Sequence, residues 1–145
     1  MIRELKDRYG QYEMEAQRAR DRAGLCDGLF GMGNDPRKAP CHQSFYDAVG
    51  QWTEVFLKSG ASAGDCEEAA VWILQAADLH REEPDVFWYL YAVQAHALSL
   101  IPRMEQEAAG KLMDWYAKAY PPKDRMPVQD KVYHALKKTA RSKLW

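Results

Sequence analysis

The sequence predicts a single all-α domain that spans residues 1–145 and is built as a bundle of five to six helices. Three observations predict this fold class. Apolar residues recur at steps of three and four along most of the chain, which is the period of one helix face. Prolines and glycines stand between the periodic segments, where helices end. The chain has 145 residues, of which 47% are hydrophobic and 28% charged, as is usual for one folded, soluble domain.

The first expected helix has a narrow apolar stripe. Its apolar positions alternate steps of three and four residues: Ile2, Leu5, Tyr9, Tyr12, Ala16, Ala19, Ala23 and Cys26. Charged residues cover the other faces of this helix. Such a stripe packs along one seam, either on the outside of a bundle or against a second copy of the chain, so a homodimer is one expected assembly.

A glycine-rich loop is expected at residues 26–40. Its three glycines and the turn sequence Asn-Asp-Pro at residues 34–36 interrupt any helix. The apolar residues between the glycines indicate a loop that is anchored to the body of the protein. Ordered loops of this length are often functional, so this segment is the first candidate for a recognition surface.

Two helices are expected after this loop. The first begins near Pro40 and stops at Gly60, with apolar residues every three or four positions. The second opens at Asp65, because Glu68 three residues later resembles a capping box, and it ends near His80.

A central hydrophobic helix is expected at about residues 85–101. The chain is apolar on all sides from Phe87 to Val93, which predicts a helix that others surround. The stretch contains Gln94, His96 and Ser99 and is shorter than the roughly 20 apolar residues that span a bilayer, so no membrane association is predicted. His96 is expected to be a hydrogen-bonded core residue, with a general-base role only if a pocket opens beside it.

Two further helices complete the predicted bundle. One follows Pro102 and ends at residues 121–122, and the other begins near Pro127. The last helix carries its cations mostly on outward faces: Lys131, Lys137, Lys138, Arg141 and Lys143. These cations could neutralise a few phosphates of a nucleic acid, but no aromatic interleaving accompanies them, which favours a solvated face.

The overall charge is nearly balanced. A net charge of -1 provides no global field that would attract nucleic acid or an anionic membrane. Locally, residues 65–85 contain seven acidic side chains and one arginine, whereas residues 123–145 contain seven basic and two acidic side chains. These two segments could pair within one chain or between two copies. The three cysteines have no recognised spacing and the first residues show no apolar signal-peptide run, so a cytoplasmic location is expected.

Cys26, Cys41 and His42 are candidate zinc ligands, because thiolate and imidazole groups suit zinc. Their spacing does not support a site. Adjacent Cys and His side chains point in different directions on a helix, and the sequence has no Cys-x-x-Cys pair. Neither a metal nor another cofactor is therefore predicted.

Arg37 and His42 are candidate catalytic residues. Four residues separate them, and this spacing resembles the Arg-x4-His motif of small all-helical nucleases, in which the His transfers a proton and the Arg stabilises charge. Pro40 lies inside the motif and disfavours helix at Ala39. An enzyme that uses these two residues with Asp35 is therefore kept only as the alternative.

Two segments loosely resemble the tetratricopeptide repeat, a pair of antiparallel helices. The matching residues are Ala70, Leu74, Ala77, Pro84 and Trp88 in the first segment, and Ala109, Met113 and Pro121 in the second. The offset of 39 residues between Ala70 and Ala109 differs from the 34 of that repeat, and its glycine is missing. The resemblance predicts a helical scaffold without establishing membership of that family.

The sequence favours a non-enzymatic protein–protein interaction or adaptor module that binds another protein or a second copy of itself. Aromatic residues make up 12% of the chain, and exposed aromatic residues anchor interfaces. The expected partner-binding residues lie in and just after the glycine-rich loop: Phe30, Met32, Asn34, Asp35 and His42. A nuclease-like or zinc-binding protein that uses residues 26–42, and a tetratricopeptide-like scaffold, are the alternatives.

Overall fold

The computed structural model describes the backbone at residues 2–30, 39–79 and 91–141, and the side chains at residues 2–21, 39–76 and 91–141. Within these ranges all regular structure is helical and no strand occurs, which confirms the predicted all-α class. None of the described helices combines the length and the apolar character that crossing a membrane requires.

The described elements include α-helices and short 3-10 helices. In chain order they are α1 (Ile2–Phe30), α2 (Pro40–Lys58), α3 (Ala63–Leu79), η2 (Gln94–Ser99), η3 (Ile101–Arg103), α5 (Gln106–Ala119), η4 (Pro122–Asp124) and α6 (Pro127–Arg141). The elements labelled η are 3-10 helices, which are wound more tightly than an α-helix. Residues 91–93 are α-helical and lead directly into η2.

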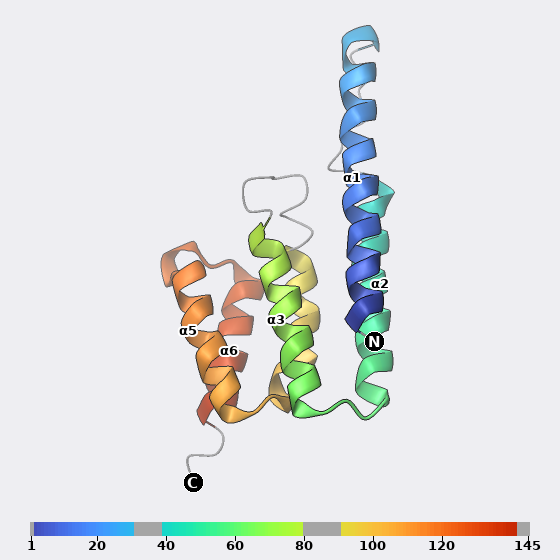
Figure 1. The fold of residues 1–145 in the computed structure, drawn as a ribbon. Helices are drawn as coiled ribbons and strands as arrows, with labels where there is room; N and C mark the ends of the chain where they lie inside the picture. Colours follow the sequence, from blue (N-terminus) through green and yellow to red (C-terminus); the bar gives the residue numbers. More distant parts are fainter. Residues whose placement is uncertain (1, 31–38, 80–90, 142–145) are drawn as a thin grey trace.

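Three antiparallel pairs stand side by side (Figure 1). α1 packs on α2, α3 packs on η2 and η3, and α5 packs on α6. Neighbouring pairs meet where α2 contacts η2, where η2 contacts α6, and where α3 contacts α5. The helices therefore form two layers, with α1, α3 and α5 in one and α2, η2 and α6 in the other.

The first pair is held by the apolar seam that the sequence predicts. The buried side chains on α1 are Leu5, Tyr9, Tyr12, Ala16 and Ala19. The Tyr12 ring stacks on Phe45 of α2, with 4.6 Å between the ring centroids and an interplanar angle of 2°. Tyr9 also makes an edge-on contact with Trp72 of α3 at 5.1 Å. α1 is thus joined to both of its neighbours by aromatic contacts.

The middle of the bundle lies between α3 and the segment 91–103. The buried residues there are Ala69, Ala70, Ile73 and Leu74 on α3, and Val93, Ala97, Leu100 and Ile101 on the facing segment. Alanines on both sides of this contact let the two backbones approach closely. The larger apolar residues belong to the same buried cluster as these alanines, so the contact between α3 and the segment 91–103 is part of the core.

A buried polar cluster joins the second and third pairs. The Tyr116 hydroxyl donates to Gln94 Oε1 at 2.6 Å, and Gln94 Nε2 donates to the Tyr120 hydroxyl at 3.4 Å. Gln94 and Tyr116 are both 0% exposed. Burial is the main reason that the pKa of Tyr116 is raised well above its ordinary value, so its hydroxyl stays protonated and can donate. The cluster satisfies polar atoms that would otherwise be costly to bury.

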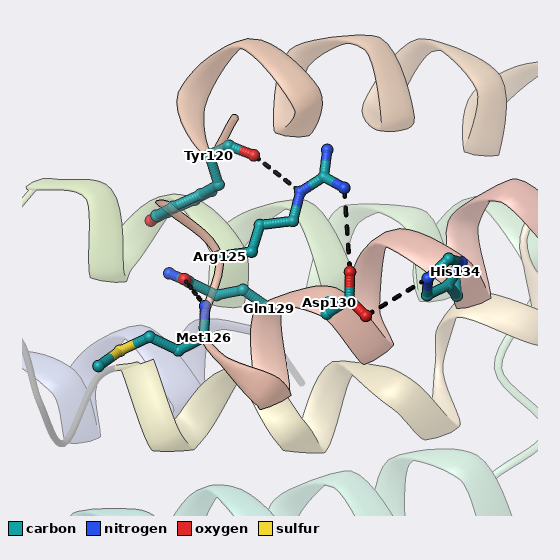
Figure 2. Close-up of polar contacts among 6 residues, drawn as sticks. All are labelled: Tyr120, Arg125, Met126, Gln129, Asp130 and His134. Carbon is teal, nitrogen blue, oxygen red and sulfur yellow. Dashed lines mark hydrogen bonds and ion pairs between the residues drawn. The ribbon is translucent and has the colours of Figure 1, made fainter. Parts of the chain in front are cut away.

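The turn between α5 and α6 is held by one arginine (Figure 2). Arg125 Nε donates to the Tyr120 carbonyl at 2.8 Å. The guanidinium carbon of Arg125 also lies 3.8 Å from the centre of the Tyr133 ring, which the figure does not draw. A longer ion pair of 4.0 Å joins Arg125 to Asp130, whose other oxygen lies 3.4 Å from His134. The side chain of Arg125 is only 7% exposed, so these contacts fix the turn rather than present a free cation.

The first turn of α6 is capped by two side chains. Gln129 Oε1 accepts the Met126 amide at 3.1 Å, which is one half of a capping box (Figure 2). The hydroxyl of Tyr91 accepts the Val128 amide at 3.1 Å and so ties α6 to the middle pair. Both contacts satisfy amide groups that have no partner inside the helix.

The start of α3 corrects the prediction by three residues. The sequence places Asp65 at the cap, but the helix begins at Ala63 and the capping box is formed by Ser62 and Asp65. Ser62 Oγ accepts the Asp65 amide at 3.1 Å, and Asp65 Oδ2 accepts the Ser62 amide at 3.3 Å. Both serine and aspartate cap helices well, so composition alone did not separate the two registers.

The glycine-rich loop does not begin where the sequence placed it. α1 continues through residues 26–30 and ends at Phe30, so this part of the predicted loop is helical. A glycine in a helix costs about 1 kcal/mol relative to alanine and need not end it. Residues 31–38, the rest of the predicted loop, lie outside the described part of the chain.

The predicted central helix is only partly described. Residues 85–90 lie outside the described ranges, and the continuation is 3-10 rather than α-helical from Gln94 to Ser99. Pro102, in η3, has no amide hydrogen to bond to the carbonyl of residue 98, which weakens an α-helical turn there. The apolar side chains of this stretch are nevertheless buried at Val93, Ala97 and Leu100.

Candidate functional site

A pocket of about 490 Å³ opens between α2 and η2. From α2 it is lined by Tyr46, Asp47, Gly50, Gln51, Thr53, Glu54 and Leu57. From η2 it is lined by His96 and Ser99. The volume lies within the range of pockets that bind ligands, and the lining mixes apolar walls with polar groups.

The floor of the pocket is formed by His96 lying on the backbone of α2. A β-carbon placed on Gly50 would come within 2.8 Å of His96 Cε1, so only glycine leaves room for the ring. His96 Nε2 lies 3.0 Å from the Tyr46 carbonyl, and the rings of His96 and Tyr46 pack with 4.4 Å between their centroids. These contacts fix the imidazole against α2 in one orientation.

The protonation of His96 follows from the same contacts. Burial lowers the pKa of His96 below its ordinary value, and this effect exceeds the opposing effects of the Tyr46 carbonyl and the Asp47 charge. The ring is therefore neutral near pH 7. A carbonyl can only accept a hydrogen bond, so Nε2 carries the hydrogen and Nδ1 is left with a lone pair.

The rim of the pocket is acidic. Asp47 and Glu54 are exposed and lie seven residues apart, so they share one face of α2 about 10.5 Å apart along its axis. Asp47 Oδ1 accepts a hydrogen bond of 2.9 Å from Nε2 of the Gln43 side chain. No lysine or arginine lines this pocket, and no described lysine or arginine forms an ion pair with either carboxylate. The rim thus presents two carboxylates that form no direct ion pair with any described lysine or arginine.

A second hollow of about 400 Å³ lies between α1 and α3. Its lining includes Trp72 and Val71 but also carries both signs of charge, Lys6 on α1 and Glu67 and Glu68 on α3. It has no fixed imidazole and no uniform sign of charge. The pocket between α2 and η2 is therefore the stronger candidate.

His42 is placed in the core and does not line either hollow. It is 1% exposed, and its Nδ1 lies 2.6 Å from the hydroxyl of the fully buried Tyr12. The two rings also meet edge to face, with centroids 5.5 Å apart. His42 thus joins α2 to α1 in the core, and its predicted roles in binding, catalysis or zinc coordination stay predictions.

The other candidate residues from the sequence lie mostly outside the described side chains. These are Cys26, Phe30, Met32, Asn34, Asp35 and Arg37. Their roles in binding, catalysis or zinc coordination therefore stay predictions. Cys41 and Cys66 are described; both side chains are buried and neither forms a disulfide. Among the described side chains, no three His, Cys, Asp or Glu residues are grouped so that they could hold a metal ion.

Sequence reasoning missed the pocket because its two walls are far apart in the chain. The α2 wall shows one local signal: a glycine inside an amphipathic helix, which indicates close approach by another group. Asp47, Gln51 and Glu54 also recur at helical spacing on one face. The role assigned to His96 depended on a pocket opening beside it, and the structure shows such a pocket.

No protein-family model, curated protein or solved structure matched this chain. What the pocket can bind must therefore be judged from its own residues. Its fixed groups are acceptors and carboxylates, held on two helices that pack against each other. A pocket with these groups can recognise hydrogen-bond donors and positive charge.

Proposed function

We propose that this chain is a non-enzymatic protein-interaction module that binds a segment of a partner protein in the pocket between α2 and η2. One observation carries the proposal: a pocket of about 490 Å³ whose floor is a histidine fixed on a glycine backbone. Apolar surface from Tyr46 and Leu57 lies beside polar groups, which is the usual composition of a recognition site.

The hydrogen bonds of the hydroxyl groups in the pocket favour a binding role over a catalytic role. A catalytic serine or threonine needs a hydrogen bond to a base. Here Ser99 Oγ donates to the carbonyl of His96 at 3.0 Å, and Thr53 Oγ1 donates to the Val49 carbonyl at 2.7 Å. The Nε2 atom of His96 is bonded to the Tyr46 carbonyl. Both hydroxyls and Nε2 are therefore directed to backbone, and neither hydroxyl is bonded to the imidazole ring.

The architecture supports an interaction role. Antiparallel helix pairs standing side by side expose grooves between successive helices of one layer, and helical-repeat proteins use such surfaces for binding. The pocket lies between two such neighbouring helices, α2 and η2. A helical-repeat-like scaffold and an adaptor module are thus compatible descriptions. A cytoplasmic location and homodimerisation remain parts of the proposal that rest on the sequence. The α1 seam from Leu5 to Ala19 is buried within the chain, so a second copy would have to use another surface.

Selection from a random dodecapeptide library tests this function. The wild-type chain is the bait, and selected peptides are titrated against a filled-pocket variant, Gln51→Trp with Ser99→Trp. Both positions are exposed, so the fold should tolerate the change. We expect the filled pocket to weaken the selected peptides at least about tenfold.

The control variant adds the same two rings elsewhere. Asp114→Trp with Lys118→Trp changes two exposed positions on α5, outside the pocket. It should leave the affinities unchanged. Peptides that bind the wild-type chain and both variants equally, or a library from which nothing is enriched, would contradict a binding role for this pocket.

A further inference from the structure

We propose that the segment bound in the pocket is basic, with one lysine or arginine side chain pairing with Asp47 and another with Glu54. This inference rests on the function proposed above and names the chemistry of the partner. Both carboxylates belong to the pocket, both are exposed, and neither is paired with a lysine or arginine in the part of the chain described.

The neutral groups of the pocket favour the same ligand. The lone pair on His96 Nδ1 is an acceptor, the Gln51 side chain can accept or donate, and guanidinium and ammonium groups are donors only. A neutral imidazole also adds no competing cation near Asp47. Lysine and arginine carry long apolar stems, which can lie against Tyr46 and Leu57 while their charged ends reach the rim.

The spacing of the two carboxylates indicates the spacing of the cations. Asp47 and Glu54 lie about 10.5 Å apart along α2. In a polyproline II segment, which has three residues per turn and a rise of about 3.1 Å, residues separated by three positions lie on the same face about 9 Å apart. The geometry therefore matches an Arg-x-x-Arg or Lys-x-x-Lys segment in this conformation better than a single basic residue.

Other charged occupants fit less well. Phosphate groups of a nucleic acid or lipid would be repelled by the two carboxylates. One divalent cation needs ligands within 2.0–2.6 Å, which carboxylates two helical turns apart do not provide without large movement. Binding of a second copy of this chain is a separate outcome of the test, because α6 exposes cations that could pair with the two carboxylates: Lys131, Lys138 and Arg141.

Binding of two hexapeptides to the full chain tests the inference. The first is Gly-Arg-Leu-Ala-Arg-Gly, blocked at both ends and carrying a neutral fluorescent label. The second replaces both arginines by citrulline, which keeps the shape and removes the charge. We expect the citrulline peptide to bind at least about tenfold more weakly at low salt, and the difference to shrink as salt is added.

Two matched variants locate the effect. Asp47→Asn with Glu54→Gln should weaken the arginine peptide about tenfold and leave the citrulline peptide unchanged. Glu4→Gln with Asp114→Asn makes the same change in net charge at exposed positions outside the pocket and should leave both peptides unchanged. Equal weakening by both variants would show only a global charge effect and would overturn the inference.

The outcomes separate this inference from the function it rests on. If peptides selected from the dodecapeptide library require an open pocket but carry no excess of lysine or arginine, the interaction role stands and the basic ligand is wrong. If the filled-pocket variant binds the arginine peptide as well as the wild-type chain does, the pocket is not the binding site. Self-association in sedimentation experiments that disappears in Asp47→Asn with Glu54→Gln would assign the cations to a second copy and overturn a foreign partner.

Discussion

At the scale of residues, the account depends on a glycine and a histidine that are 46 positions apart. Gly50 is helical, where an alanine would ordinarily be preferred. His96 occupies the space that a side chain at position 50 would need. The glycine therefore lowers the helix propensity of α2, but it leaves room for a hydrogen bond and a ring contact between α2 and η2.

Substituting alanine at Gly10 and at Gly50 tests whether His96 occupies the space beside Gly50. Gly10 is also helical but has nothing within 4 Å of an added β-carbon, so Gly10→Ala should raise the free energy of unfolding by about 0.5–1 kcal/mol. Gly50→Ala should displace the ring and lose about 1 kcal/mol of hydrogen bonding, which cancels or exceeds that gain. Urea unfolding measures both. An equal gain at both positions would contradict the close approach of His96.

The protonation of His96 gives a pH prediction. Its pKa in the folded chain is lowered by burial, whereas the unfolded chain has the ordinary value of 6.5. Between these two values the unfolded chain binds more protons, so the free energy of unfolding should rise with pH across that window and level off above about pH 7. His96→Gln should remove this component of the pH dependence. A pH profile that is identical for the wild-type chain and His96→Gln would show that the folded pKa is not lowered.

At the scale of elements, helix periodicity predicted most of the described helices, and local capping chemistry decided their ends. The steps of three and four residues agree with the buried positions along α1 and most of α2. In α5 the buried face is Ala109, Leu112 and Tyr116 rather than the face of Ala108, Trp115 and Ala119 that the spacing also allows. In α6 the fully buried apolar residues are Val132 and Leu136. Gly60 ends α2 as predicted, with a φ of 81° that favours glycine. The start of α3, the end of α1 and the 3-10 character of η2 were not predicted, because each depends on a competition between nearly equal local conformations.

The cap of α3 provides a test at this scale. Ser62 and Asp65 exchange two hydrogen bonds, and both are exposed. Ser62→Ala should lower the free energy of unfolding by about 1 kcal/mol, and Ser62→Asp should retain most of the stability because aspartate is also a good cap. Thermal unfolding of the three proteins measures the difference. If Ser62→Ala is neutral while Asp65→Ala is destabilising, the capping register inferred from the sequence would be the correct one.

At the scale of the whole molecule, the pocket exists because of how the pairs are arranged. α2 and η2 are adjacent in one layer although the whole of α3 lies between them in the chain (Figure 1). The sequence specified the apolar faces of these helices but not which faces would meet, since many pairings bury similar areas. For the same reason the sequence directed attention to residues 26–42, a local cluster of chemically distinctive residues, and missed a site assembled from two distant walls.

The most direct test of the central claim is a two-dimensional amide NMR titration of the full chain with the arginine hexapeptide. The claim is that a partner segment binds between α2 and η2. It predicts saturable shifts concentrated at Gly50, Gln51, His96 and Ser99. With the citrulline peptide, or in the variant Asp47→Asn with Glu54→Gln, the same shifts should need roughly tenfold more peptide to reach half of their full size. Shifts concentrated instead on α1 and α3, or spread over the basic face of α6, would contradict it.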